Sequence, residues 1–437
     1  MHCPKDGVNL TNLAIAYLRL GARQLAAQTL EQARRLNPND VSVYLTLAEI
    51  YREEREYNLA AESYRKILNQ LPSCAEAEHG LGDCCSNLGQ VAEAAAALKR
   101  AHELKPSSVA IVYALSQLPA SATDVPILAS LDQVRKDEGQ DQDTFDTFVA
   151  FALAAALDRQ GRHVEAWSAL REANRREFPK HESAYRKQVV RMNTAREAAL
   201  HESAIHTGDR PKNPQSQPLS LFIVGPSRSG KTTLEHLVAQ LEGVKCGYES
   251  RLVERAARRT SQLSGLLTIR NPSDLPKALD DRFREIYLEE VQEFAQGASI
   301  VTDTYPAMIP YVGRVATTLP NARFIFIKRD RYDCALRIFM KHYRAGNDYA
   351  YDIGTIFAYI TWYYAMADLW LEKFPKATLS LDYDQMVAEP EATLVRIAGF
   401  CGASIAVSSS PNLGDDRGCS QVYREFIDLA LGEQASA

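Results

Sequence analysis

The fold of the C-terminal half is decided by one stretch, Leu221-Phe222-Ile223-Val224-Gly225-Pro226-Ser227-Arg228-Ser229-Gly230-Lys231-Thr232-Thr233. Four apolar residues run into a loop bounded by glycines, and hydroxyl residues and a helical pattern follow. The spacing fits G-x-x-x-x-G-K-S/T, which is typical of a phosphate-binding loop when a strand precedes it. Such a loop presents backbone N–H groups and the positive end of a helix to an oxyanion. We therefore expect a phosphorylated nucleotide to bind here.

Composition narrows the class of protein. The chain has 437 residues, enough for two or three domains, and a net charge of −5 gives no reason to expect a nucleic-acid or membrane partner. The N-terminus lacks the apolar stretch of a signal peptide, and the longest apolar run, 148–157, is too short to span a bilayer. Eight cysteines without a C-x-x-C pair suggest neither a disulfide framework nor a zinc site. We expect a cytoplasmic protein with reduced thiols and no bound metal.

The N-terminal half repeats itself about every 34 residues. A leucine, an alanine and a proline recur in each copy, at Leu13, Leu47 and Leu81, at Ala26, Ala60 and Ala94, and at Pro38, Pro72 and Pro106. Small alanines let two helices approach closely, and proline ends a unit because it cannot continue a helix. The pattern resembles the tetratricopeptide repeat, a helix–turn–helix unit that must stack on its neighbours.

The repeats predict an all-α solenoid over residues 1–178. One degenerate repeat covers about 107–147, within which 119–142 reads as irregular and polar, and a further good copy spans about 148–174. Such solenoids usually bind a protein or peptide in a concave groove. The alternative is that this solenoid only scaffolds the C-terminal domain, and both interpretations stay open.

A linker and an α/β domain follow. Residues 179–217 read as a connecting helix, over 183–206, and a proline-rich polar linker. From 218 to 437, short apolar runs at 221–224, 299–302, 324–327 and 379–381 alternate with helical patterns, which predicts a mostly parallel sheet. Ligands of such sheets bind at the carboxyl ends of the strands.

The C-terminal half resembles the bacterial sulfotransferases that carry N-terminal tetratricopeptide repeats and are related to the protein-tyrosine sulfotransferases. The family's loop P-R-S-G-T-T-L is similar to the loop at 227–233, and its segment V-R-C-G-E-E-T-R is similar to Val244–Arg251. The family's P-N-A-R-hydrophobic-R-R-D is similar to Pro320–Asp330. The resemblance covers about 221–431 and implies a P-loop-type sulfotransferase domain.

The resemblance also implies a co-substrate and residue roles. It implies transfer of a sulfuryl group from 3′-phosphoadenosine-5′-phosphosulfate to a hydroxyl, with a protein tyrosine as one candidate acceptor. Glu249 would be the general base, and Arg251 would help to place the acceptor. The 5′-phosphosulfate would be held from the loop, and the 3′-phosphate by a guanidinium, so the implied cofactor-binding residues are Arg228, Ser229, Gly230, Lys231, Thr232, Thr233, Arg329, Arg337 and Tyr383.

Three departures from the family pattern stand out, and a fourth offsets one of them. Thr304 replaces the lysine of the family's D-K-x-P, which assists the leaving group, and Arg337 replaces a serine of the 3′-phosphate site. The segment 404–421 is shorter than the family's usual cofactor-covering stretch. Lys231, in turn, replaces a family threonine. Our hypothesis is that Lys231 supplies the catalytic cation that Thr304 lacks.

Two other functions compete with the sulfotransferase. The first is a kinase or NTPase that uses ATP and Mg²⁺, resting on Gly225–Thr232 with Asp303 as a metal-side carboxylate. The second is an interaction protein whose transferase domain has decayed, so that the repeats alone carry function. The acceptor, whether peptide tyrosine, sugar, lipid or small molecule, is not identified by any residue pattern in the chain.

Overall fold

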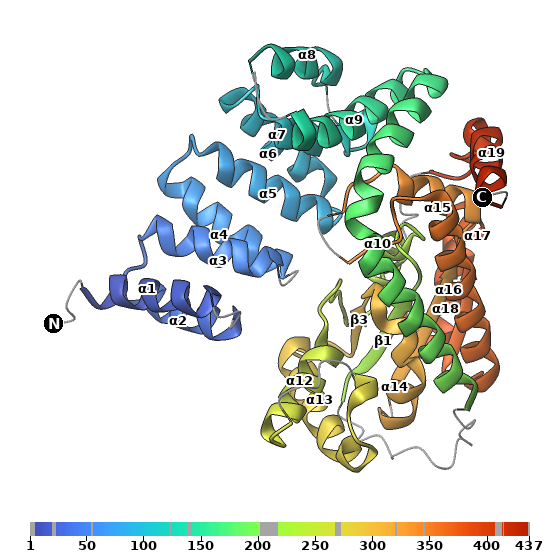
Figure 1. Ribbon diagram of the computed structural model, residues 1–437. Coiled ribbons are helices and arrows are strands. Elements are labelled where there is room, and N and C mark those ends of the chain that lie inside the picture. Colours follow the sequence, from blue (N-terminus) through green and yellow to red (C-terminus); the bar gives the residue numbers. More distant parts are fainter. Residues whose placement is uncertain are drawn as a thin grey trace. The chain divides into compact units, whose positions relative to one another are not determined.

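The computed structural model describes residues 5–19, 23–53, 56–122, 124–137, 142–201, 217–266, 272–319, 321–343, 346–406, 413 and 415–435. The chain divides into two compact units, Met1–Ala173 and Asn174–Ala437 (Figure 1). Within the described ranges, no helix is both long and apolar enough to cross a membrane. The predicted fold class is confirmed: repeats of helices precede a parallel five-stranded sheet domain.

The first unit is a succession of helices in which each packs on the next (Figure 1). Ala26, Ala60 and Ala94, which recur in the sequence, are fully buried at the helix contacts, as a close approach of two helices requires. The helices are α1 (Lys5–Arg19), α2 (Arg23–Leu36), α3 (Val41–Glu53), α4 (Tyr57–Gln70), α5 (Ala75–Asn87), α6 (Val91–Leu104), α7 (Val109–Ser116), α8 (Ile127–Asp137), α9 (Gln142–Arg159) and the start of α10 (His163–His201).

One sequence expectation about the repeats is wrong. The stretch 119–142, expected to be irregular, contains helix α8. Ile127, Leu131 and Val134 lie on one face of this helix and are almost completely buried. Their spacing of four and three residues is the helical one, so the burial of this face against α7 and α9 stabilises a helix in a segment rich in polar residues.

Helix α10 is a single helix of 39 residues that includes Asn174, the first residue of the second unit. The expected connecting helix over 183–206 lies on α10 as far as His201. The expected linker lies outside the described residues except for Gln217 and Pro218.

The second unit contains a parallel sheet in the order β2-β3-β1-β4-β5. The strands are β1 (Leu219–Val224), β2 (Val244–Lys245), β3 (Ile300–Asp303), β4 (Ala322–Lys328) and β5 (Thr378–Asp382). Because all pairs are parallel, the carboxyl ends of the strands meet at one edge. The expected strands are all present, and the two-residue β2 is an addition.

Both faces of β1 are buried, as a central parallel strand requires. Leu221 and Ile223 share a core cluster with residues of α11 (Lys231–Val238), α17 (Tyr383–Ala388) and α18 (Pro390–Cys401). Phe222 points the other way and stacks on Phe324 of β4, with ring centroids 5.1 Å apart. Packing on both faces therefore fixes the position of β1, and with it the point at which the following loop begins.

The remaining helices of this unit are α12 (Leu252–Leu263), α13 (Asp280–Ala295), α14 (Val312–Thr318), α15 (Arg331–Phe339), α16 (Ile353–Lys373) and α19 (Arg424–Ala435). Helices α13 and α14 pack on β3 and β4, and α16 packs on β5. Short 3-10 turns complete the unit at η2 (Pro272–Asp274), η3 (Lys277–Leu279), η4 (Pro306–Tyr311) and η5 (Gln421–Tyr423).

Candidate functional site

The loop after β1 is shaped by two residues with positive φ. Arg228 has φ 64° and Gly230 has φ 95°, and α11 begins at Lys231. A Cβ on Gly230 would lie 2.3 Å from the ring of Tyr383, so only glycine fits between the loop and this ring. The ring of Tyr383, the first residue of α17, thus packs against the loop at Gly230.

Hydrogen bonds from other elements hold the same loop. The Ser227 carbonyl accepts from the thiol of Cys334 at 3.3 Å, and the Ser227 hydroxyl donates to Asn347 at 3.2 Å. Ser229 is fully buried, and its hydroxyl has no hydrogen-bond partner among the described residues. A buried polar atom without a partner is costly unless a ligand satisfies it, so this hydroxyl fits a loop that receives an anionic group.

Lys231 is turned into the loop. Its side chain is buried, and Nζ donates to the Pro226 carbonyl at 2.9 Å. The ammonium group thus lies across the loop that opens at Gly225. Thr232 is exposed and Thr233 half-buried at the start of the same helix.

Arg329 lies directly after β4, and contacts of both its backbone and its side chain hold it in place. Its backbone N–H donates to the Tyr364 hydroxyl at 2.9 Å, and that hydroxyl donates to the Arg329 carbonyl at 2.8 Å. Its guanidinium lies 4.5 Å from the centroid of the Tyr383 ring, and Nη1 donates to the Arg228 carbonyl at 3.1 Å. The structure therefore brings Arg228, Gly230, Arg329 and Tyr383 together.

Arg337 joins this group through a carboxylate that sequence analysis missed. Its Nε donates to Asp416 Oδ2 at 2.9 Å, and its Nη2 donates to Oδ1. Arg329 Nη2 donates to the same Oδ2 at 3.0 Å and to the Asp416 carbonyl at 2.5 Å. Arg329 and Arg337 are thus two arms of one clamp, which we call the arginine clamp. Such a pair of guanidinium forks suits a carboxylate or a phosphate.

The second half of the site follows β2. The Gly247 N–H donates to Thr302 Oγ1 at 3.0 Å, and the Tyr248 carbonyl accepts from the Thr304 N–H at 2.6 Å. A Cβ on Gly247 would lie 2.1 Å from the Thr302 carbonyl, so the loop lies directly on the end of β3. Glu249, half-buried, is thereby carried to the carboxyl edge of the sheet.

Arg251 lies beside the segment that departs from the family pattern. Its guanidinium carbon is 5.0 Å from the ring centroid of Tyr305, and its Nε is buried without a hydrogen-bond partner among the described residues. Arg251 has φ 56° and precedes α12. Thr304, which cannot carry charge, is buried two residues before Pro306.

Three buried carboxyl groups surround this half of the site. Burial raises the pKa of Glu235 and of Asp303 to about 7, and the charge of Glu249 adds to both shifts. Burial also raises the pKa of Glu254 to about 8. Glu235 Oε1 accepts from the Tyr248 N–H at 2.9 Å and from the Thr302 hydroxyl, so this carboxyl fixes the loop that carries Glu249.

Asp303 has both carboxylate oxygens engaged within the protein. Oδ1 accepts from the Tyr305 N–H at 2.8 Å, and Oδ2 accepts from the Ser250 hydroxyl at 3.0 Å. These two donors tie Asp303 to the segments that contain Ser250 and Tyr305, so we assign this carboxyl a structural role in holding the two segments together. Across the described ranges, no three His, Cys, Asp or Glu side chains are grouped so as to hold a metal ion.

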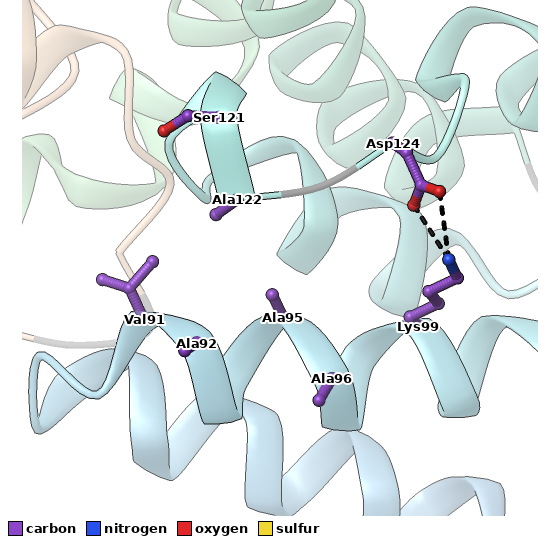
Figure 2. Close-up of a pocket in the computed structure, with 8 residues that line it drawn as sticks. All are labelled: Val91, Ala92, Ala95, Ala96, Lys99, Ser121, Ala122 and Asp124. Carbon is purple, nitrogen blue, oxygen red and sulfur yellow. Dashed lines mark hydrogen bonds and ion pairs between the residues drawn. The ribbon is translucent and has the colours of Figure 1, made fainter.

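The first unit has a hollow of its own, of about 600 Å³ (Figure 2). Ala92, Ala95 and Ala96 of α6 line one side, and Ser121 and Ala122 of the 3-10 turn η1 (Ala120–Ala122) line the other. At one end, the Lys99 ammonium bonds both carboxylate oxygens of Asp124 at 3.0 Å. A hollow with an apolar floor and an ionic end can accept a peptide side chain.

Residues 218–406 match the Sulfotransferase family, and residues 11–72 and 45–109 match the tetratricopeptide repeat. An uncharacterized protein of Aquifex aeolicus (strain VF5) is 23% identical over 387 residues, which are 84% of this chain and 48% of that protein. The chain thus spans about half the length of this curated relative.

Solved structures similar to this chain include TPR proteins. The crystal structure of MamA is 20% identical with a TM-score of 0.32 and covers 39% of this chain and 96% of its own. YrrB, described as a TPR protein with an unusual peptide-binding site, is 18% identical with a TM-score of 0.33 and covers 42% of this chain and 92% of its own. A thermophilic TPR protein of Thermus thermophilus is 21% identical with a TM-score of 0.30 and covers 39% of this chain and 91% of its own.

The raised pKa values predict a pH-dependent stability. A carboxyl with a raised pKa binds its proton more tightly in the folded chain than in the unfolded chain. The stability that protonated Glu235 contributes is therefore fully present below the unfolded pKa of about 4, and it is lost as pH rises through the folded pKa of about 7. We expect Glu235→Gln to raise the free energy of unfolding at pH 8 by up to about 3 kcal/mol relative to the wild type, and to change little at pH 4.

Chemical denaturation at the two pH values measures this difference. Glu242→Gln is the matched control, because Glu242 is exposed. An equal effect of Glu235→Gln at both pH values would show that the carboxyl of Glu235 does not titrate as proposed.

Proposed function

We propose that this chain, which carries a sulfotransferase-family domain behind tetratricopeptide repeats, transfers a sulfuryl group from 3′-phosphoadenosine-5′-phosphosulfate to an acceptor hydroxyl. The single observation that carries the proposal is the bond from Arg329 Nη1 to the Arg228 carbonyl, 3.1 Å long. It joins the loop after β1, which suits one anionic group, to the arginine clamp, which suits a second one. A nucleotide with anionic groups at both its 5′ and 3′ positions has the matching chemistry.

The residues of the chain fit this donor. The N–H groups of the loop, with Arg228, Ser229, Gly230, Thr232 and Thr233, would hold the 5′-phosphosulfate at the start of α11. The clamp would hold the 3′-phosphate, and Tyr383, between Gly230 and Arg329, would pack near the nucleotide. The donor supplies a sulfuryl group on a phosphate leaving group.

Glu249 is proposed as the general base. It accepts the proton of the acceptor hydroxyl while the oxygen attacks sulfur, a new S–O bond forms and the S–O bond to the phosphate breaks. The products are a sulfate ester and adenosine 3′,5′-bisphosphate. Arg251, beside Tyr305, would place the acceptor. The acceptor proposed for the first assays is a peptide tyrosine, because tetratricopeptide repeats suit a protein or peptide partner and the hollow between α6 and η1 can take a side chain.

Calorimetric titration separates the competing functions. We expect adenosine 3′,5′-bisphosphate to bind and ATP–Mg²⁺ to bind far more weakly. Binding of ATP–Mg²⁺ alone would support the kinase or NTPase, in which Asp303 would have to give up its two internal donors. Binding of neither nucleotide would support the decayed domain, and the repeats would then carry the function.

Replacing Glu249 tests its role as the base. Glu249→Gln removes the proton acceptor but keeps the size of the side chain, so we expect binding of adenosine 3′,5′-bisphosphate to persist and turnover to fall by about 10²-fold or more. Sulfate-ester formation on a tyrosine peptide measures turnover, and exposed Glu242→Gln is the control. An equal loss of binding and turnover would assign Glu249 a structural role.

Lys231 is proposed to stabilise the charge on the leaving phosphate, in place of the lysine that Thr304 replaces. Its ammonium already lies across the loop, on the Pro226 carbonyl. We expect Lys231→Ala to lower the single-turnover rate by about 10²-fold, the usual scale for one electrostatic group. Exposed Lys376→Ala is the control. Unchanged turnover in Lys231→Ala would rule out this role.

A further inference from the structure

Asp416 occupies the arginine clamp with its own carboxylate. Arg337 grips both of its oxygens, and Arg329 Nη2 bonds Oδ2 at 3.0 Å. Burial by itself would raise the pKa of Asp416, but the bonds and charges of Arg337 and Arg329 outweigh it and hold this pKa below the usual range. The carboxylate is therefore charged at neutral pH and makes the contacts that a phosphate would make.

An anion of the same kind cannot share these donors. Arg329 is almost completely buried, and its Nη2 is engaged by Asp416 through both the side chain and the carbonyl. A phosphate seated between the two guanidiniums would lie against the Asp416 carboxylate, and the two negative charges repel. The clamp thus holds either Asp416 or a phosphate, but not both.

The segment around Asp416 is built so that it can give way locally. The buried carboxylate of Asp333 accepts from the Gly418 N–H at 2.7 Å, from the Ser420 N–H at 2.8 Å and from the Ser420 hydroxyl at 2.6 Å. Gly418 has φ 65°, a conformation that glycine adopts freely. The residues from 418 to 420 are thus anchored by Asp333, whose carboxylate also lies 4.0 Å from Arg329 Nη2, and Asp416 can leave the clamp without breaking these three bonds.

We propose that Asp416 is an internal competitor of the donor's 3′-phosphate and sets the selectivity of the site between adenosine 3′,5′-bisphosphate and adenosine 5′-monophosphate. The inference rests on the proposed function, because it assigns the clamp to the 3′-phosphate. The 3′,5′-bisphosphate must displace Asp416, whereas the 5′-monophosphate leaves it in place. Affinity for the bisphosphate is therefore reduced by the fraction of molecules in which the clamp is open.

Removing the charge of Asp416 tests the proposal. We expect Asp416→Asn to tighten binding of adenosine 3′,5′-bisphosphate by about tenfold or more, which corresponds to a clamp open in about a tenth of wild-type molecules. Binding of adenosine 5′-monophosphate should change by less than about twofold, since that ligand leaves the clamp closed. Titration calorimetry on the full chain measures both affinities. The matched control is Asp415→Asn, because Asp415 pairs only with Arg417 among its described contacts.

A second variant and a second measurement keep the proposal testable if Asp416→Asn does not fold. Arg337→Met combined with Asp416→Asn should lose the gain in bisphosphate affinity, since one arm of the clamp is gone. In the wild type, trypsin cleavage after the exposed Arg417 should quicken on adding the bisphosphate but not the monophosphate. Hydrogen exchange at the amides of Gly418 and Ser420, which are bonded to Asp333, should stay slow with either nucleotide.

The outcomes separate this inference from the proposed function. A wild type that binds the bisphosphate, with an affinity that Asp416→Asn leaves unchanged or weakens, would overturn the competitor and leave the sulfotransferase standing. Equal tightening for both nucleotides would also overturn the claim of selectivity. If neither nucleotide binds the wild type or Asp416→Asn, both proposals fail together.

Discussion

The C-terminal domain is organised around a buried guanidinium. A charge out of water must be satisfied by acceptors, or the folded chain loses several kcal/mol. Arg329 donates to a carbonyl of the loop after β1 and to the carboxylate and carbonyl of Asp416, while its buried Nε has no partner among the described residues. Its own backbone is fixed by the Tyr364 hydroxyl. One side chain thus ties together three segments that are far apart in the sequence.

The opposite kind of charge organises the other half of the site. Glu235 and Asp303 are buried, and they hold the loop of Glu249 through N–H and hydroxyl donors. Their raised pKa values place their titration near neutrality. The carboxyl edge of the sheet therefore carries the guanidinium groups of Arg228 and Arg329 after β1 and β4, and the carboxyl groups of Glu249 after β2 and of Asp303 at the end of β3. Such an arrangement suits an anionic donor on one side and a proton acceptor on the other.

The strands of the sheet and the repeated helices could be predicted, because the spacing of apolar residues along the sequence determines both. The run Leu221–Val224 needs burial on both faces, and the recurring alanines are buried where helices meet. The segment that contains α8 was misjudged, because the polar residues around the short apolar stretch from Ile127 to Leu131 hid its helical spacing. Asp416 was out of reach, because its partner Arg337 is 79 residues away and only the folded chain brings them together. Glu235 reads as a surface residue of α11 until β3 covers it.

The strand pairing has a consequence for how the chain matures. The repeats are made of contacts between neighbouring helices, so they can form as soon as they leave the ribosome. Strand β1 pairs instead with β3 and β4, and its register with β4 sets Ser220 opposite Ala322. During synthesis β1 must wait, unpaired, until β3, which begins at Ile300, and then β4, which begins at Ala322, have emerged. During this interval the unpaired apolar strand is open to aggregation, and a chaperone that covers it would protect the nascent chain.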